Sequence, residues 1–239
     1  MKRQYTDENL NSNLKVKSII EKHYDEKNKS LTLDFNGLDN DHIVNLNATN
    51  IEVETLHILP SLSTRNNYDE KIFINKKITL LSQFIKGHPN LKTLDLTGID
   101  ISDEIITDES LAAFSQALSE SGIKKIKFDG ANTKLKNNNY HHIYSNNTIN
   151  NYYIGPKILR ALAKPNILKN VESISFVNCN ICTNDNGAKA IADFINACPN
   201  LTELNLSGNQ IKDRGLKIIA YSLTHTTLQT ILLDSNKIT

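Results

Sequence analysis

The 239-residue sequence predicts an α/β protein built from stacked repeats. Three observations lead to this prediction. A short apolar frame, Leu-x-x-Leu-x-Leu, returns along most of the chain, and apolar residues at helical spacing lie between its copies. The last two complete units, from Val171 to Leu201 and from Leu201 to Leu228, are 30 and 27 residues long, which suits one strand and one helix. Neighbouring units are expected to stack, because no unit can bury its apolar face alone.

The strands are clearest in the C-terminal half of the chain. The copy at 201–211 continues with Asn209 and Ile211, the copy at 228–238 matches at every fixed position, and the copy at 171–181 has Cys179 in place of the asparagine. Apolar side chains at the fourth and sixth positions of the frame point to one face of a short strand. The asparagine then turns the chain, and its amide satisfies backbone groups of neighbouring coils.

Other copies are less regular. The copy at Leu91 follows Pro-Asn, as the copy at Leu201 does, whereas the copy at Ile123 continues with Ala131 and Thr133 and the copy near 53 has serines where Asn and Ile belong. About seven repeats result; they start near residues 28, 53, 91, 123, 171, 201 and 228. We expect the core to rest on Leu94, Leu96, Leu204, Leu206, Ile231 and Leu233.

Amphipathic helices are expected between the strands. In residues 111–118, apolar side chains recur at helical spacing, and either Asp108 or Ser110 is suited to cap the start of this helix. Pro156 is well placed for a first helical turn. The same spacing predicts helices at 78–86, 156–164, 187–197 and 214–224.

Two units are longer than the repeat requires. The 38 residues from Val53 to Leu91 contain an insertion at 64–77, and the 48 residues from Ile123 to Val171 contain one at 134–154. Both follow a strand and precede a helix, so we expect both as loops at the same edge of the stack. The second is either drift in a sequence rich in Asn and Lys or a binding loop, because tyrosine supplies contact area at low entropy cost. Its tyrosines are Tyr140, Tyr144, Tyr152 and Tyr153.

The two ends of the chain differ from the repeats. Residues 1–27 are polar and charged with scattered apolar positions, and we expect a short capping helix over the first repeat, ahead of a repeat domain at 28–239. At the other end, the chain stops just after a consensus strand and turn. Either the last coil is exposed or the chain is a fragment of a longer protein, and we favour the fragment.

Composition narrows the class of function. The chain has 27 Lys and Arg against 26 Asp and Glu, a formal charge of +1, which argues against nucleic acid or an anionic membrane as the main partner. Three cysteines do not make a disulfide framework and indicate a reduced compartment. The N-terminus is polar where a signal peptide needs an apolar core. We therefore expect a cytoplasmic protein, or one secreted without a cleavable signal peptide into a host cytosol.

No motif indicates catalysis, a cofactor or a metal site. Phosphate-binding, dinucleotide-binding, nucleophile-elbow and zinc-protease patterns do not occur in the sequence. Cys179 and Cys182 form a Cys-x-x-Cys pair without a second ligand pair, and Cys179 falls in the asparagine position of its repeat, so we interpret it as structural. His141 and His142 are adjacent in sequence and have no acidic cluster around them. We expect no enzyme activity, no cofactor and no bound metal.

Across residues 28–239 the repeats resemble those of leucine-rich-repeat proteins, and their length is similar to that of the ribonuclease-inhibitor-like subclass. The resemblance implies a curved solenoid, or horseshoe, with parallel strands on the concave face, helices on the convex face and protein binding as the usual function. The composition also looks like that of leucine-rich-repeat effectors that intracellular bacteria deliver into host cells, although an AT-rich protist gives the same signature. The alternative is the substrate-recognition part of a larger enzyme such as a ubiquitin ligase.

The outward positions of the strands are the candidate binding surface for a protein partner. Lys124 and three further lysines of this surface are either a solvated face or an attachment point for an acidic protein surface. RNA binding is poorly supported, because Glu54, Glu172 and Glu203 share the surface. The proposed partner-binding residues are Lys92, Asp95, Lys125, Lys127, Ser173, Ser175, Glu203 and Asn205, together with the tyrosines Tyr140, Tyr144, Tyr152 and Tyr153.

Overall fold

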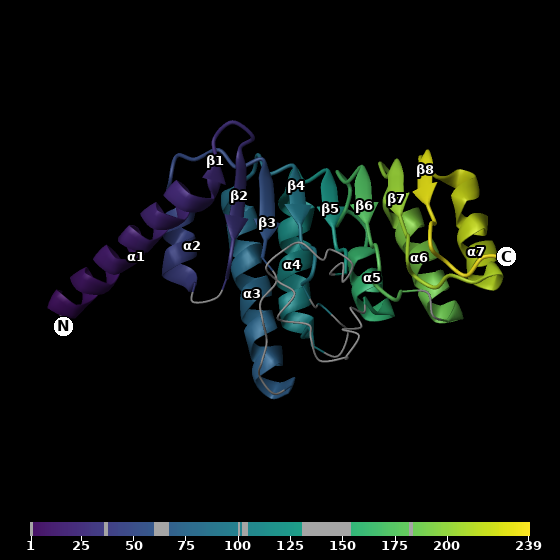
Figure 1. Ribbon diagram of the computed structural model, residues 1–239, viewed down its shortest axis with the longest axis horizontal. Helices are drawn as coiled ribbons and strands as arrows, with labels where there is room; N and C mark the ends of the chain where they lie inside the picture. Colours follow the sequence, from purple (N-terminus) through teal and green to yellow (C-terminus); the bar gives the residue numbers. More distant parts are fainter. Residues whose placement is uncertain are drawn as a thin grey trace.

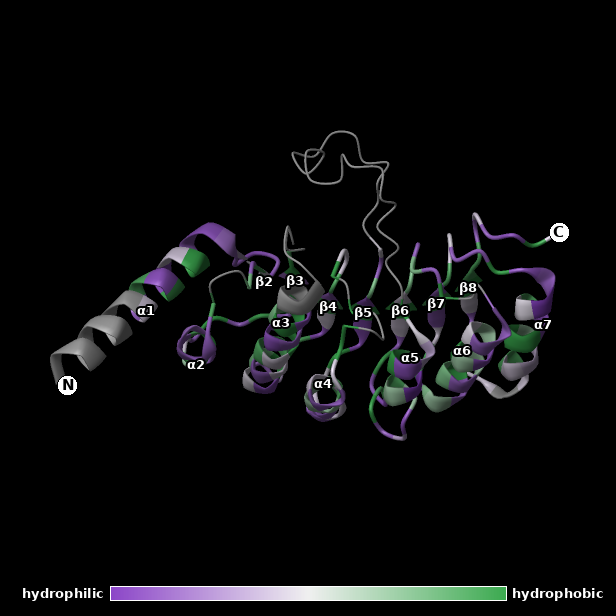
Figure 2. Cartoon of the chain, turned by 90° about the horizontal axis from the view of Figure 1, so that it is seen from below, coloured by the Kyte–Doolittle hydropathy of each residue, from purple (hydrophilic) through white to green (hydrophobic). Residues whose placement is uncertain are grey.

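In the computed structural model the chain forms one open, uncurled sheet with helices packed along one of its faces (Figure 1). The structure describes residues 2–35, 38–59, 67–99, 101, 105–130, 154–181 and 184–239. The sheet and the helices are two layers: Figure 2 shows the strands in one row and helices α2 to α7 on one side of that row. We refer to the other side of the sheet as the open face.

The strands follow one another across the sheet in sequence order. Strands β2 to β8 are parallel, and the short β1, which the repeat frame did not predict, pairs with β2 in the antiparallel sense. Their bounds are β1 Tyr24–Asp25, β2 Ser30–Leu33, β3 Thr55–Ile58, β4 Thr93–Asp95, β5 Lys125–Lys127, β6 Ser173–Ser175, β7 Glu203–Asn205 and β8 Thr230–Leu232.

The helices alternate with the strands, as the spacing of the repeats predicts. Each lies in the connection between two parallel strands, apart from the first, which precedes the sheet (Figure 1). Their bounds are α1 Lys2–His23, α2 Asn40–Asn47, α3 Asn67–Gly87, α4 Asp108–Glu120, α5 Pro156–Leu162, α6 Asp185–Ala197 and α7 Asp213–Ser222, with a 3₁₀ turn, η1, at Leu223–His225.

The register of the parallel strands confirms the repeat frame in every unit. The fourth position of each copy aligns with the fourth position of the next, so that one apolar residue per strand forms a continuous row across the sheet. This row points toward the helices and is the spine of the core. Its members are Leu31, Leu56, Leu94, Ile126, Ile174, Leu204 and Ile231.

Burial along this core is not uniform. Leu94, Leu96, Leu204 and Leu206 are fully buried, as expected. Ile231 and Leu233, which we also expected in the core, are only partly buried. The reason is their place in the fold, because β8 is the edge strand and has a neighbour on one side only.

Helix α3 corrects the first expected insertion. Residues 67–77, which we expected within a loop, form the first half of this helix. Ile74 is buried like Ile78, Leu81 and Ile85, and these positions are spaced by four, three and four residues. The helical spacing of buried residues therefore extends back to Ile74, within the expected insertion. The extra residues of this unit lengthen the helix instead of forming a loop.

The starts of two other helices follow from local chemistry. Thr107 caps α4, because its side chain accepts a hydrogen bond from the amide of Ser110, so the expectation of Asp108 or Ser110 as the cap was wrong by one to three positions. Pro156 stands in the first turn of α5, as expected, after Gly155 in extended conformation. Asp108 remains favourable in the first turn of its helix because a carboxylate there interacts with the helix dipole.

Helix α1 makes up most of the N-terminal segment and contacts the first repeat. Val16 and Ser12 are buried, and the side-chain amide of Asn45 in α2 donates to the hydroxyl of Ser12 at 2.9 Å. The start of the helix extends away from the sheet (Figure 1). These contacts support the expected capping role of residues 1–27, which remains a proposal. The second insertion, at 134–154, lies outside the described residues up to 153.

Candidate functional site

The open face carries three rows of outward side chains, from the second, third and fifth positions of each repeat. Parallel strands lie about 4.8 Å apart, so consecutive members of a row are direct neighbours. The second-position row, aligned by backbone hydrogen bonds just before the strands, is Lys29, Glu54, Lys92, Lys124, Glu172, Thr202 and Gln229. The third-position row is Ser30, Thr55, Thr93, Lys125, Ser173, Glu203 and Thr230. The fifth-position row is Thr32, His57, Asp95, Lys127, Ser175, Asn205 and Leu232.

The structure brings the proposed strand residues together. All eight belong to these three rows, and they lie on β4 to β7 or immediately before β4. Each of the eight residues has another proposed residue next to it, on a neighbouring strand or in its own strand. The four tyrosines, Tyr140, Tyr144, Tyr152 and Tyr153, lie outside the described residues. The rows form one contiguous polar surface, and its use as a binding site is developed below as a proposal.

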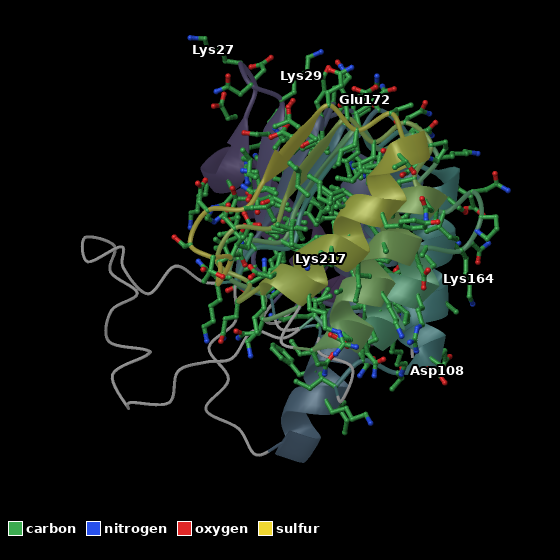
Figure 3. The ribbon with its side chains drawn as sticks, turned by 90° about the vertical axis from the view of Figure 1, so that its right-hand side faces the viewer. Lys27, Lys29, Asp108, Lys164, Glu172 and Lys217 are labelled. Atoms are coloured by element: carbon green, nitrogen blue, oxygen red, sulfur yellow. The ribbon has the colours of Figure 1, made fainter. Side chains whose placement is uncertain are left out.

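Ion pairs connect the second-position row. Lys29 bridges Glu52 at 2.8 Å and Glu54 at 3.3 Å, and Glu54 also pairs with Lys92 at 2.8 Å. These hydrogen bonds raise the pKa of Lys29, and those from Lys92 and Lys29 lower the pKa of Glu54. Further along the same row, Lys124 pairs with Glu172 at 2.6 Å. Figure 3 shows Lys29 and Glu172 at the edge of the molecule where the strands begin.

A second polar network lies in the fifth-position row, around Asp95. Its carboxylate accepts hydrogen bonds from the amide and the hydroxyl of Thr97 at 3.0 and 2.6 Å, and it lies 3.2 Å from Nδ1 of His57 and 3.7 Å from Nζ of Lys127. Burial alone would raise the pKa of Asp95, but the bonds from Thr97 and the charges of Lys127 and His57 outweigh it and hold that pKa below its ordinary value. Asp95 is therefore an ionised group that orients a histidine and a lysine on the two neighbouring strands.

His57 is the member of this network that sequence reasoning missed. It lies in the least regular copy of the frame, at the fifth position, and the register places it beside Asp95. The repeat frame contained the signal, because aligning this copy with the next one puts the histidine and the carboxylate in adjacent positions.

The part of the open face on β6 and β7 is less charged. Ser173 donates to a carboxylate oxygen of Glu203 at 3.2 Å, and Ser175 donates to Asp129. The side-chain oxygen of Asn205 accepts from the amide of Ser207 at 3.0 Å, which fixes the turn that follows β7. These side chains are partly buried and already oriented by their neighbours.

Buried amides below the end of the strands hold the coils in register. The side chain of Asn209 is fully buried; it accepts from the amides of Cys179 and Ile181 and donates to the carbonyls of Phe176 and Leu206 at 2.6 and 2.9 Å. Asn236 repeats this pattern one coil later, accepting from the amides of Asn209 and Ile211 and donating to Leu206 and Leu233. The predicted role of the asparagine position is confirmed at both residues.

Cys179 occupies the same position one coil earlier, as the sequence predicts. Its thiol donates to the carbonyl of Phe128 at 3.1 Å, which corresponds to the bond that Asn209 makes to Phe176. Burial, and then the nearby charge of Asp129, raises the pKa of Cys179 far above its ordinary value, and burial raises the pKa of Cys198 to about 12. Both thiols stay protonated and are poor nucleophiles. Cys182 lies outside the described residues.

The described part of the chain contains neither a cluster of metal-ligating side chains nor a membrane-spanning helix. No group of three or more His, Cys, Asp or Glu side chains there has an arrangement that could hold a metal ion. Of the helices described, none is long and apolar enough to cross a membrane. His141 and His142 lie outside the described residues.

Comparison with known proteins supports the repeat assignment. The family model described as Leucine Rich repeat matches residues 197–220, which run from the end of α6 through β7 and Asn209 into α7. No curated protein matches the chain. The matched unit contains the apolar frame and its asparagine, and its strand is in register with the other parallel strands of the sheet. One unit of this chain is thus similar to a leucine-rich repeat, and the shared register supports a leucine-rich-repeat protein.

Proposed function

We propose that the chain is a protein-interaction module that binds a partner protein through the open face of β4 to β7, and that it has no catalytic activity of its own. The observation that carries the proposal is the register of the strands, which makes one contiguous polar surface out of residues that are far apart in sequence. The leucine-rich-repeat match is consistent with such a module. Helices α2 to α7 lie along one side of the sheet, and the open face is the other side (Figure 2).

The side chains of this surface are already positioned for binding. Lys92, Lys124 and Lys127 each pair with a carboxylate from a neighbouring strand, and Ser173 is held by Glu203. A partner that contacts them has little side-chain freedom to remove, and preorganisation of this kind increases affinity. The pattern of both charge signs also favours one orientation of the partner over others.

We also propose a repeat subclass and a biological setting for the chain. Helices α4, α6 and α7, with 13, 13 and 10 residues between strands, support the ribonuclease-inhibitor-like subclass. Two hypotheses assign a setting to this surface. In one, the protein is a bacterial effector delivered into a host cell; in the other, it is the substrate-recognition part of a larger enzyme such as a ubiquitin ligase. The four tyrosines of the segment before α5 are proposed to add contacts beside it.

A capture experiment with surface variants tests the proposal. Intact protein is compared with Lys125→Glu/Lys127→Glu, with a deletion of residues 136–152, and with Lys189→Glu as a control on the exposed side of α6; circular dichroism first establishes that each is folded. We expect proteins that bind the intact chain and the Lys189 variant to be lost from the open-face double variant. Binding that survives both open-face and deletion changes but is lost in the Lys189 variant would assign the interface to the helices.

A further inference from the structure

Lys125 differs from the other lysines of the open face. Lys92, Lys124 and Lys127 pair with Glu54, Glu172 and Asp95 at 2.8, 2.6 and 3.7 Å. Lys125 is exposed at the centre of the sheet, and no carboxylate among the residues that the structure describes forms an ion pair with it. The fold therefore provides a counter-charge for three of these lysines and leaves the fourth directed at solvent.

The neighbours of Lys125 complete an environment suited to a carboxylate. In the third-position row its neighbours are Thr93 of β4 on one side and Ser173 of β6 on the other, and both carry a hydroxyl. Lys127 is on the same face, two residues further along the strand than Lys125, and Lys124 is the residue immediately before Lys125. A lysine next to a threonine hydroxyl offers donors that match the acceptor oxygens of a carboxylate.

We propose that the centre of the open face, around Lys125, is the docking point for an acidic segment of the partner protein. A glutamate or aspartate side chain of that segment pairs with Lys125 and accepts a hydrogen bond from the hydroxyl of Thr93. This inference rests on the proposed function and deepens it, because it names the chemistry of the partner and the residue that anchors it.

The charges around this centre favour an acidic protein segment over nucleic acid. Glu54 before β3, Glu172 before β6 and Glu203 on β7 flank the lysines of β4 and β5. A nucleic acid backbone needs a run of cations along its length, and these carboxylates would repel it on both sides. An acidic segment of a protein needs only one local cation, and basic residues next to it can pair with the flanking glutamates.

Lys125 should matter more than its neighbours for this docking. When a partner carboxylate approaches Lys92, Lys124 or Lys127, it competes with the carboxylate already bound within the fold. At Lys125 no ion pair among the described residues has to be broken, and the approach of the partner removes water from the new pair and strengthens it. Binding energy at interfaces is concentrated in such residues.

Fluorescence anisotropy with a defined probe tests the inference. The probe is a short fluorescein-labelled peptide of alternating glutamate and glycine, with a lysine–glycine peptide and a single-stranded DNA oligonucleotide as comparisons, all at low salt. We expect the glutamate peptide to bind best, Lys125→Gln to weaken it by about five- to tenfold, and Lys125→Arg to retain binding. The control Lys189→Gln, which removes an exposed lysine of α6, should have no effect.

Two results would overturn the inference. One is an equal effect of Lys125→Gln and Lys189→Gln on the glutamate peptide; the other is tighter, Lys125-dependent binding of the oligonucleotide, which would assign the centre to nucleic acid. Repeating the capture experiment with Lys125→Gln and with Glu203→Ala separates this inference from the proposed function. A partner lost with Glu203→Ala but retained with Lys125→Gln keeps the open face as the interface and removes the acidic docking point.

Discussion

The C-terminal coils and the middle of the molecule keep the same strand register by different chemistry. Between β6 and β8, neighbouring coils are connected by amide hydrogen bonds that are buried at Asn209 and partly buried at Asn236. Before β3 and β4, exposed ion pairs among Lys29, Glu54 and Lys92 connect the coils from the open face. The comparison teaches that the frame of apolar residues determines the register, and that polar residues of either kind can secure it.

The family match covers residues 197–220, within the region that the asparagines secure. The matched unit contains both the apolar frame and the asparagine, whereas the copies near 53 and 123 have Ser61 and Ala131 at the asparagine position. Their strands are nevertheless in register with the matched one through the whole sheet. Four predictions test this comparison, from the largest expected effect to the smallest.

Truncation of the core should have the same effect in both regions. Leu94→Ala and Leu204→Ala each remove a fully buried side chain, and each should lower the free energy of unfolding by about 2–5 kcal/mol. Ile231→Ala should cost less, because that residue is only partly buried at the edge strand. Urea denaturation followed by circular dichroism measures all three. A smaller loss for Leu204 than for Ile231 would mean that the repeat frame is wrong.

A buried lysine should make the middle region sensitive to pH. Lys77 of α3 is 3% exposed; its ammonium group lies 4.3 Å from the ring centre of Phe73 and has no hydrogen-bond partner among the described residues. Burial lowers the pKa of Lys77 to about 8, although the charge of Asp34 acts in the opposite direction. The folded protein therefore releases this proton at lower pH than the unfolded chain does.

The sign of the effect follows from these pKa values. Below pH 8 both states are protonated and folding bears the full cost of burying the charge; between about pH 8 and 10.4 stability rises with pH, and above that range it levels off. Lys77→Met should stabilise the protein at pH 7 by about 1–3 kcal/mol and remove this contribution to the pH dependence. Melting temperatures of both proteins at pH 7 and 10 test it, and an unchanged difference between them contradicts it.

Loss of the buried amide should affect the C-terminal coils specifically. Asn209→Ala leaves the amides of Cys179 and Ile181 and the carbonyl of Phe176 without their partner, at a cost of about 1–3 kcal/mol. Because the bonds are buried, the loss should be nearly independent of salt. Denaturation at low and high ionic strength distinguishes it from the ion-paired region, and a strongly salt-dependent loss would contradict a buried role.

The smallest effect is expected at the network of the open face. Asp95→Asn removes the charge that pairs with His57 and Lys127 and should cost about 1 kcal/mol. Because the folded-state pKa of Asp95 is lowered, its contribution is present above the ordinary carboxyl pKa of about 3.9 and is lost as pH falls through the lower folded-state value. Stability measured between pH 6 and 2 should show a shallower decline for the variant, and parallel curves would show that Asp95 contributes nothing.

Sequence reasoning was most successful where spacing alone decides the outcome. The apolar frame located all seven parallel strands, because alternation along a strand and stacking between units leave one way to bury the apolar side chains. The same frame placed Lys92, Asp95, Lys125 and the other proposed residues on one surface. The prediction was wrong for residues 67–77. The length of that unit suggested a loop, whereas the helical spacing from Ile74 onward belongs to α3.

By itself, the sequence determined the class of the fold, the strand register and the buried role of Asn209, because these depend on the order and period of residues within each unit. Tertiary structure alone decided which charges meet. The pairing of His57 with Asp95 and of Lys124 with Glu172, and the absence of a partner for Lys125 in the described residues, depend on side chains 38 and 48 positions apart or on neighbours from two strands. Coulomb energies change within a few ångströms, so only the packed strands determine them.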